Sequence, residues 1–237
     1  MKRFLLIHGS WHGAWCWYKV APRLRQHGEV LVPNLPGRGR DPAWAPRVTL
    51  GHLVRATAPL LSDQVQTTIV AHSRYGILAS ALAQAHPERV RRVVYLASYM
   101  LPSHARVADY FAKDEGCYLR PYVHVSKAGV CDWLDPEAYV EGLYADCAAD
   151  DVALASSLLC REPSLPALAR LALTDARYGR VPRAYIRLTQ DRAVSPALQD
   201  RLIDAARVER VESLEASHSA YFSQPDALVD AILSVDR

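Results

Sequence analysis

The sequence predicts a single α/β domain with a mostly parallel sheet flanked by helices, and three observations lead to this prediction. Short apolar runs alternate along the chain with amphipathic segments of helical length. Turn residues follow several of these runs directly, as expected of buried parallel strands. The 237 residues, half of them apolar, suit one domain with a sizeable core and exclude general disorder.

Six apolar segments are the predicted strands, and in chain order they cover residues 4–7, 30–32, 67–71, 93–97, 183–188 and 210–214. The second strand must end at Pro33, because the turn residues that follow cannot continue any regular element. Five helices are predicted around these strands, over residues 17–27, 50–61, 75–86, 196–206 and 225–234. Each crossover between parallel strands should be right-handed.

The alternation of strands and helices breaks between residues 101 and 180. This stretch has helical patches at 136–144, 150–159 and 165–173 but no convincing core strand. We therefore assign residues 1–100 and 181–237 to an α/β core and residues 101–180 to a helical insertion after the fourth strand. Insertions at this end of an open α/β sheet overlie the ligand crevice, so we expect a lid. A packed helical extension without a ligand role is the alternative.

Composition excludes several classes of function. The net charge of +3 is small and the basic residues are scattered, which argues against a nucleic-acid partner. Five cysteines without a C-x-x-C motif indicate neither a disulfide scaffold nor a zinc site. The first apolar run is too short for a signal peptide or a spanning helix, so we expect a soluble cytoplasmic protein without a membrane partner. The oligomeric state is not readable from the sequence, and a homodimer stays open.

Three polar residues each follow a different predicted strand. Ser73 lies in a strand–turn–helix segment, Asp191 follows the fifth strand, and His218 lies in the loop after the sixth. Alone, Ser73 or Asp191 could simply cap a helix, and a loop histidine usually has no role. Together they supply a hydroxyl, an imidazole that can take its proton, and a carboxylate that orients the imidazole. Their order along the chain is that of the α/β-hydrolase fold, and we predict a catalytic triad.

A glycine-containing segment after the first strand could complete this site. Residues 8–15 read HGSWHGAW, and Gly9 would let the backbone approach the nucleophile. The backbone N–H groups of Ser10 and of Arg74, the residue after the nucleophile, would then form an oxyanion hole. A plain strand-to-helix turn is the alternative.

Several motifs together resemble the α/β-hydrolase superfamily, and within it the esterases related to plant methylesterases and hydroxynitrile lyases. They are HGSWHGAW at 8–15, PNLPGRGRD at 33–41, the turn at Ser73, TQDR at 189–192 and the His218 loop. The resemblance implies a serine esterase that acts on a small-molecule ester through an acyl-enzyme, without a cofactor or metal. It makes Ser73 the nucleophile, His218 the general base and Asp191 its orienting acid.

Two positions separate esterases from lyases within this group. The related lyases carry a threonine after the first-strand histidine and a lysine after the catalytic histidine. This chain has Gly9 and Ser219 there, which favours ester hydrolysis.

The turn at Ser73 also departs from the pattern, because the group has glycine where this chain has Ala71 and Tyr75. A lyase-like or cyclase-like enzyme or a binding protein is therefore the alternative function. We expect the turn to persist with the Tyr75 ring displaced into a groove beside the site, so that Tyr75→Gly would keep activity. Asn34 and Arg38, which replace an aspartate and a histidine of the group, should affect loop structure more than chemistry.

Overall fold

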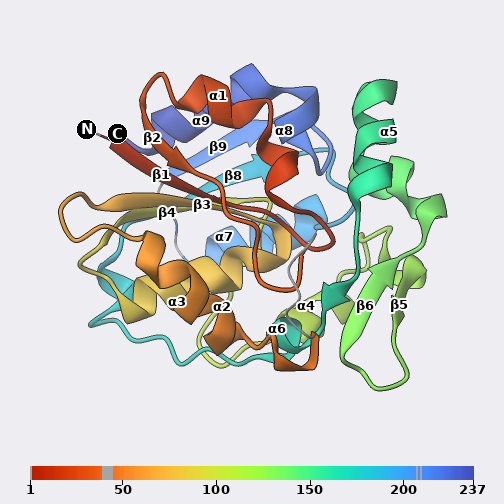
Figure 1. Cartoon of the computed structure of the whole chain (residues 1–237), viewed down its shortest axis with the longest axis horizontal. Helices are drawn as coiled ribbons and strands as arrows, with labels where there is room; N and C mark the ends of the chain where they lie inside the picture. Colours follow the sequence, from red (N-terminus) through yellow and green to blue (C-terminus); the bar gives the residue numbers. More distant parts are fainter. Residues whose placement is uncertain (1, 39–44, 207, 209) are drawn as a thin grey trace.

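The computed structural model describes residues 2–38, 45–206, 208 and 210–237, and Figure 1 shows its central sheet between two layers of helices. Within these residues the sheet has six strands in the order β2-β1-β3-β4-β8-β9, and every neighbouring pair is parallel. The strands are β1 (Lys2–Ile7), β2 (Gly28–Leu31), β3 (Thr67–His72), β4 (Val90–Leu96), β8 (Arg183–Leu188) and β9 (Arg210–Leu214). The predicted fold class is confirmed, and each strand matches a predicted segment.

Helices cover both faces of the sheet. One face carries α1 (Val20–Leu24), α8 (Ala220–Ser223) and α9 (Pro225–Val235), and the other carries α2 (Leu50–Thr57), α3 (Gly76–Ala85) and α7 (Pro196–Ala206). The predicted helix at 17–27 is shorter than expected, because a 3₁₀ turn at 14–17 precedes α1. The short helical turns are η1 (Ala14–Trp17), η2 (Ala45–Arg47), η3 (Ala58–Leu60), η4 (Ser73–Tyr75), η5 (Arg120–Tyr122), η6 (Pro136–Ala138), the π-helical η7 (Tyr139–Leu143) and η8 (Tyr178–Arg180).

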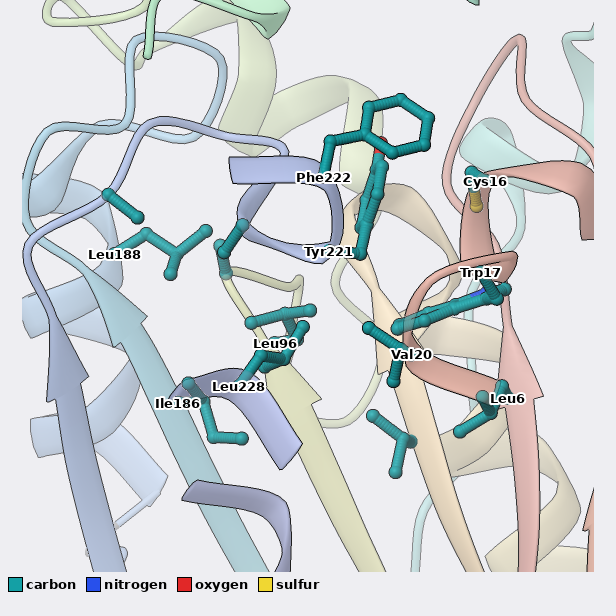
Figure 2. Close-up of a cluster of buried hydrophobic side chains, with 14 of the residues drawn as sticks. Leu6, Cys16, Trp17, Val20, Leu96, Ile186, Leu188, Tyr221, Phe222 and Leu228 are labelled. Atoms are coloured by element: carbon teal, nitrogen blue, oxygen red, sulfur yellow. The ribbon is translucent and has the colours of Figure 1, made fainter. Parts of the chain in front are cut away.

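Alternate residues of the strands fill two cores. In β1, Phe4 and Leu6 enter the core under α1 and α9, whereas Leu5 and Ile7 enter the core against α2 and α3. Figure 2 shows part of the first core, where Leu96 of β4 lies near Ile186 of β8 and Leu228 of α9. Because both faces are buried, the strands read as continuous apolar runs.

The insertion lies between β4 and β8 and occupies one side of the molecule, at the right of Figure 1. It contains α4 (Val107–Ala112), α5 (Ala149–Leu158) and α6 (Leu165–Leu168). It also contains an antiparallel sheet of β5 (Val123–Val125), β6 (Cys131–Leu134) and β7 (Glu162–Pro163). As expected, the insertion adds no strand to the six-stranded sheet of the core among the described residues. Its own small sheet was not predicted, because strands of two to four residues are too short to produce a detectable alternation.

No helix in the part of the chain that the structure describes is long and apolar enough to cross a membrane. No disulfide bond joins the five cysteines, all of which lie among the described residues.

Candidate active site

Ser73 lies at a sharp turn between β3 and α3. Its φ of 56° is in the left-handed region, which costs a residue other than glycine about 1–2 kcal/mol. Two hydrogen bonds hold this backbone: the Ser73 carbonyl accepts the N–H of Tyr99 at 3.1 Å and the hydroxyl of Ser98 at 2.6 Å. The predicted turn therefore persists despite Tyr75.

Two glycines allow close approach to this turn. A Cβ added at Gly76 would lie 2.5 Å from the Ser98 hydroxyl and 2.7 Å from the Tyr99 carbonyl oxygen. A Cβ added at Gly9 would lie 2.8 Å from Nδ1 of His72 and 3.0 Å from Cβ of Ser73. Glycine at both positions therefore brings the loop after β1 and the loop after β4 against the candidate nucleophile.

Asp191 and His218 form the acid–base pair that the sequence predicts. His218 Nδ1 lies 2.7 Å from Asp191 Oδ2, and the Asp191 side chain is fully buried. The other carboxylate oxygen accepts the N–H groups of Ala193 at 2.7 Å and Val194 at 3.0 Å, which fixes its orientation. Donation from Nδ1 to Asp191 leaves Nε2 as the basic nitrogen of a neutral ring.

Ser73 and His218 line one cavity, but no hydrogen bond joins the serine hydroxyl to the imidazole in the described structure. The contact expected of His218 is thus present toward Asp191 and absent toward Ser73. Such contacts are often loose in unliganded enzymes and tighten when substrate binds. His72 ties the two loops together, since its Nε2 donates to the His218 carbonyl at 3.0 Å. Burial lowers the pKa of His72 well below its usual value, so this ring is neutral.

The predicted oxyanion donors also line this cavity. The N–H groups of Ser10 and Arg74 make no hydrogen bond within residues 2–38, 45–206, 208 and 210–237, so both are available. Nδ1 of His12 donates a hydrogen bond to the Ser10 carbonyl at 2.6 Å, and its Nε2 accepts one from the hydroxyl of Tyr144 at 2.7 Å. Burial lowers the pKa of His12 to about 4, so it is neutral at pH 7.

The cavity has a volume of about 280 Å³, and the insertion supplies most of its apolar wall. That wall includes Val107, Phe111, Leu119, Val123, Ala167 and Leu168. The core contributes the polar end with Ser73, Arg74 and His218. A small apolar group therefore fits beside the candidate nucleophile.

The expectation for the Tyr75 side chain is wrong. The ring is fully buried among the residues that cover the α2 and α3 face of the sheet, rather than displaced into a groove. Its hydroxyl donates to Glu162 and accepts from Arg38, so its polar atom has partners in the interior. Burial raises the pKa of Tyr75 far above its usual value, and the hydroxyl stays protonated.

A buried ionic network behind the turn was not predicted. Arg74 binds both oxygens of Asp132, at 3.0 and 3.1 Å, and its guanidinium also lies 3.6 Å from Glu162. Glu162 in turn pairs with Arg38, and both side chains are fully buried. Arg38 was expected to affect loop structure more than chemistry; its guanidinium contacts the carbonyls of Pro36 and Gly37 in its own loop at 3.4 Å, in addition to Glu162. Residues 39–41 of the same turn lie outside the described residues. Asp132 and Glu162 carry no sequence signal, because each is a single acid in a segment without recognisable periodicity.

No group of histidine, cysteine or acidic side chains that could hold a metal ion occurs among the residues described.

Comparison with known proteins gives matches over nearly the whole chain. The sequence is 29% identical to putative methylesterase 11 of Arabidopsis thaliana over all of this chain and 64% of that protein. It is 29% identical to methylesterase 9 of the same plant, over 99% of this chain and 98% of the relative. The structure matches that of a pyrethroid hydrolase from Sphingobium faniae with a TM-score of 0.89, 23% identity and coverage of 99% and 97% of the two chains.

The chain spans less than two thirds of the length of the first of these relatives and nearly all of the second. The sequence model of the alpha/beta hydrolase family matches residues 4–231. This match covers the six-stranded sheet and the loops that carry Ser73, Asp191 and His218, and the chain therefore belongs to the alpha/beta hydrolase family.

Proposed function

We propose that this protein is a serine hydrolase that cleaves carboxylic esters through an acyl-enzyme on Ser73. The observation that carries the proposal is the convergence of three features on one apolar cavity. Ser73 lines it on a left-handed turn, His218 of the Asp191–His218 pair lines it, and so do Ser10 and Arg74, whose backbone N–H groups have no partner among the residues that the structure describes. Methylesterase names among the relatives support the same reaction.

The catalytic cycle follows from these positions. Ser73 Oγ attacks the ester carbonyl while Nε2 of His218 takes the hydroxyl proton. The oxyanion that forms receives hydrogen bonds from the N–H groups of Ser10 and Arg74. The tetrahedral intermediate expels the alcohol with the proton from His218. Water then attacks the acyl-enzyme with His218 again as base, and the acid leaves as Ser73 regains its proton.

The cavity indicates which esters fit. Its volume of about 280 Å³ and its aliphatic and phenylalanine lining suit methyl or aryl esters of a small apolar acid. Because the insertion provides this lining, we assign it the choice of substrate, as expected of a segment that covers the site. Arg74 is a cation at the polar end, but Asp132 pairs with it and leaves little charge to attract an acidic substrate.

The lyase alternative has less support. Ser219, at the position where the related lyases carry lysine, is fully buried and its hydroxyl donates to Tyr221. No lysine lines the cavity within the described part of the chain, so a departing cyanide ion would lack a counter-ion of that kind. A threonine in place of Gly9 would place its Cβ 2.8 Å from the His72 ring.

We also place the enzyme in the cytoplasm. Five cysteines that form no disulfide bond, two of them buried, support a reducing compartment. Fractionation of cells that produce the protein, with the esterase activity as marker, tests this location; activity confined to a secreted or membrane fraction would contradict it.

A serine-directed aryl phosphonate tests the catalytic proposal. Wild-type protein should be labelled on Ser73, as mapped by mass spectrometry, and should hydrolyse aryl acetates without releasing cyanide from mandelonitrile. The Ser73→Ala variant should fold, resist labelling and lose on the order of 10⁴–10⁶-fold in kcat. Near-full turnover by purified Ser73→Ala protein, or labelling elsewhere, would refute the mechanism.

A further inference from the structure

Carboxylates of the insertion bind the loops that carry the candidate catalytic groups. Asp114 binds the backbone N–H of Ser195 in the loop after Asp191, at 3.0 Å. Asp146 binds the N–H of Ser217, directly before His218, also at 3.0 Å. Glu162 binds the N–H of Trp11, directly after Ser10, at 2.8 Å. The insertion therefore holds three loops of the core as well as lining the cavity.

Glu162 has the most constrained surroundings of these carboxylates. It is fully buried on β7, and its Oε2 accepts the Trp11 N–H. Its Oε1 accepts the hydroxyl of Tyr75 and pairs with Arg38. The Trp11 N–H, the Tyr75 hydroxyl and the Arg38 guanidinium all donate to this side chain. The position therefore requires a side chain with two acceptor oxygens, such as a carboxylate.

The bond to Trp11 restrains the peptide next to one oxyanion donor. The N–H of the Ser10–Trp11 peptide is bound by Glu162 at 2.8 Å, and its carbonyl is bound by His12 at 2.6 Å. The peptide plane is thus held at both ends, with Trp11 at a φ of 61° in the left-handed region. A further bond from the N–H of Cys160 to the Trp11 carbonyl, at 3.0 Å, fixes the following peptide.

The other oxygen of Glu162 contacts side chains of the segment that carries the second oxyanion donor. Tyr75 follows Arg74 directly, and the Arg74 guanidinium itself lies 3.6 Å from Oε1. One carboxylate therefore contacts the segments on both sides of the hole. Tyr75, which stands where glycine is usual, supplies one of these links.

We propose that Glu162 is a positioning residue of the oxyanion hole, which holds the Ser10 and Arg74 segments at the spacing that a tetrahedral intermediate needs. The proposal rests on the proposed esterase function. The carboxylate does not touch substrate; it acts through Trp11, Tyr75 and Arg38. Loss of its charge should weaken binding of the oxyanion more than binding of the ester.

The test is Glu162→Gln, whose amide oxygen can serve only one of the two sides. We expect kcat for an aryl acetate to fall about 10–100-fold with KM within about twofold, less than the 10²–10³-fold typical of removing an oxyanion donor. Affinity for a trifluoromethyl ketone, which forms an oxyanion adduct on serine, should fall by the same factor. Affinity for a non-hydrolysable ether analogue of the ester should stay within about twofold.

Asp151→Asn is the matched control. Asp151 is also a buried carboxylate of the insertion and pairs with Lys19 at 2.6 Å and with the hydroxyl of Tyr18. Lys19 and Tyr18 lie outside the loops of the candidate site. This variant should lose stability and keep kcat.

A double variant separates positioning from folding. Glu162→Gln leaves the buried Arg38 cation without its partner, and adding Arg38→Gln removes that charge. The double variant should recover thermal stability while kcat stays low. Recovery of kcat together with stability, an unchanged kcat in Glu162→Gln, or equal losses for the ketone and the ether analogue would each overturn the proposal. Wild-type protein that neither turns over esters nor reacts with the phosphonate would instead refute the esterase function.

Discussion

The parallel sheet and the part of the insertion that lies beside Ser73 are held by different interactions, although other side chains of the insertion also join the apolar cores. Strand residues such as Leu6 and Val94 are fully buried in cores of aliphatic and aromatic side chains. The insertion meets the core beside Ser73 through buried ions, where Asp132 binds Arg74 and Glu162 binds Arg38. Apolar packing tolerates substitutions that conserve volume, whereas an ion pair that loses one partner leaves an uncompensated charge. We therefore expect the sheet to depend on volume and the contact with the insertion to depend on the placement of charge.

The largest expected effect belongs to a carboxylate of the core. Asp191→Asn should lower kcat about 10⁴-fold with little change in the fold, because the amide no longer favours the tautomer with a basic Nε2. Steady-state kinetics and circular dichroism measure both quantities. Asp200→Asn is the matched control, since Asp200 is half exposed and pairs with Arg187 on the surface. A loss below about tenfold in Asp191→Asn would contradict the assigned role.

The next largest effect tests whether Tyr75 links the core of the sheet to Glu162 of the insertion. Tyr75→Gly removes a fully buried ring and leaves Glu162 and Arg38 without its hydroxyl, so the free energy of unfolding should fall by about 3–5 kcal/mol. Tyr75→Phe keeps the ring and should cost about 1–2 kcal/mol. Urea denaturation measures both. If Tyr75→Gly is as stable as the wild type, the tyrosine lies in a groove as the sequence suggested.

Acid should weaken a hydrogen bond between the two regions. His12, whose pKa burial lowers to about 4, receives the Tyr144 hydroxyl from the insertion. In the unfolded chain the imidazole of His12 takes up a proton below about pH 6.5, whereas in the folded protein it does so only near pH 4. The stabilisation is therefore complete above pH 6.5 and is lost as the pH falls toward 4. The loss should reach up to about 3 kcal/mol. His12→Gln should reduce, without abolishing, the slope of the stability profile measured in urea between pH 7.5 and 4.5, because burial also lowers the pKa values of His8 and His72. An identical slope in both proteins would exclude His12 as its source.

The smallest effect should come from an apolar side chain of the insertion. Leu168 lines the cavity but is 47% exposed, so Leu168→Ala should change the free energy of unfolding by less than about 0.5 kcal/mol. It should raise KM a few-fold for esters with a longer apolar acyl chain and leave methyl and acetyl esters unaffected. Leu158→Ala on α5 is the control, because Leu158 is 40% exposed and lies outside the cavity lining. Equal KM values for all esters in Leu168→Ala would remove this residue from the substrate site.

The sequence by itself determined the sheet and the candidate triad. Strands buried on both faces are continuous apolar runs, and the residues that follow them must meet at one edge, so Ser73, Asp191 and His218 could be placed together. Gly9 was also informative, because close backbone approach leaves no space for a side chain.

Only the tertiary structure decided how the insertion meets the core. The short strands β5, β6 and β7 have no periodic pattern, and they bring Asp132 and Glu162 to Arg74, Tyr75 and Arg38, far away in the sequence. Tyr75 was misplaced for this reason: its volume argued against the interior, but its hydroxyl finds partners there that no local pattern reveals. Apolar periodicity is a local property of the chain, whereas the pairing of single buried charges exists only after distant segments have come together.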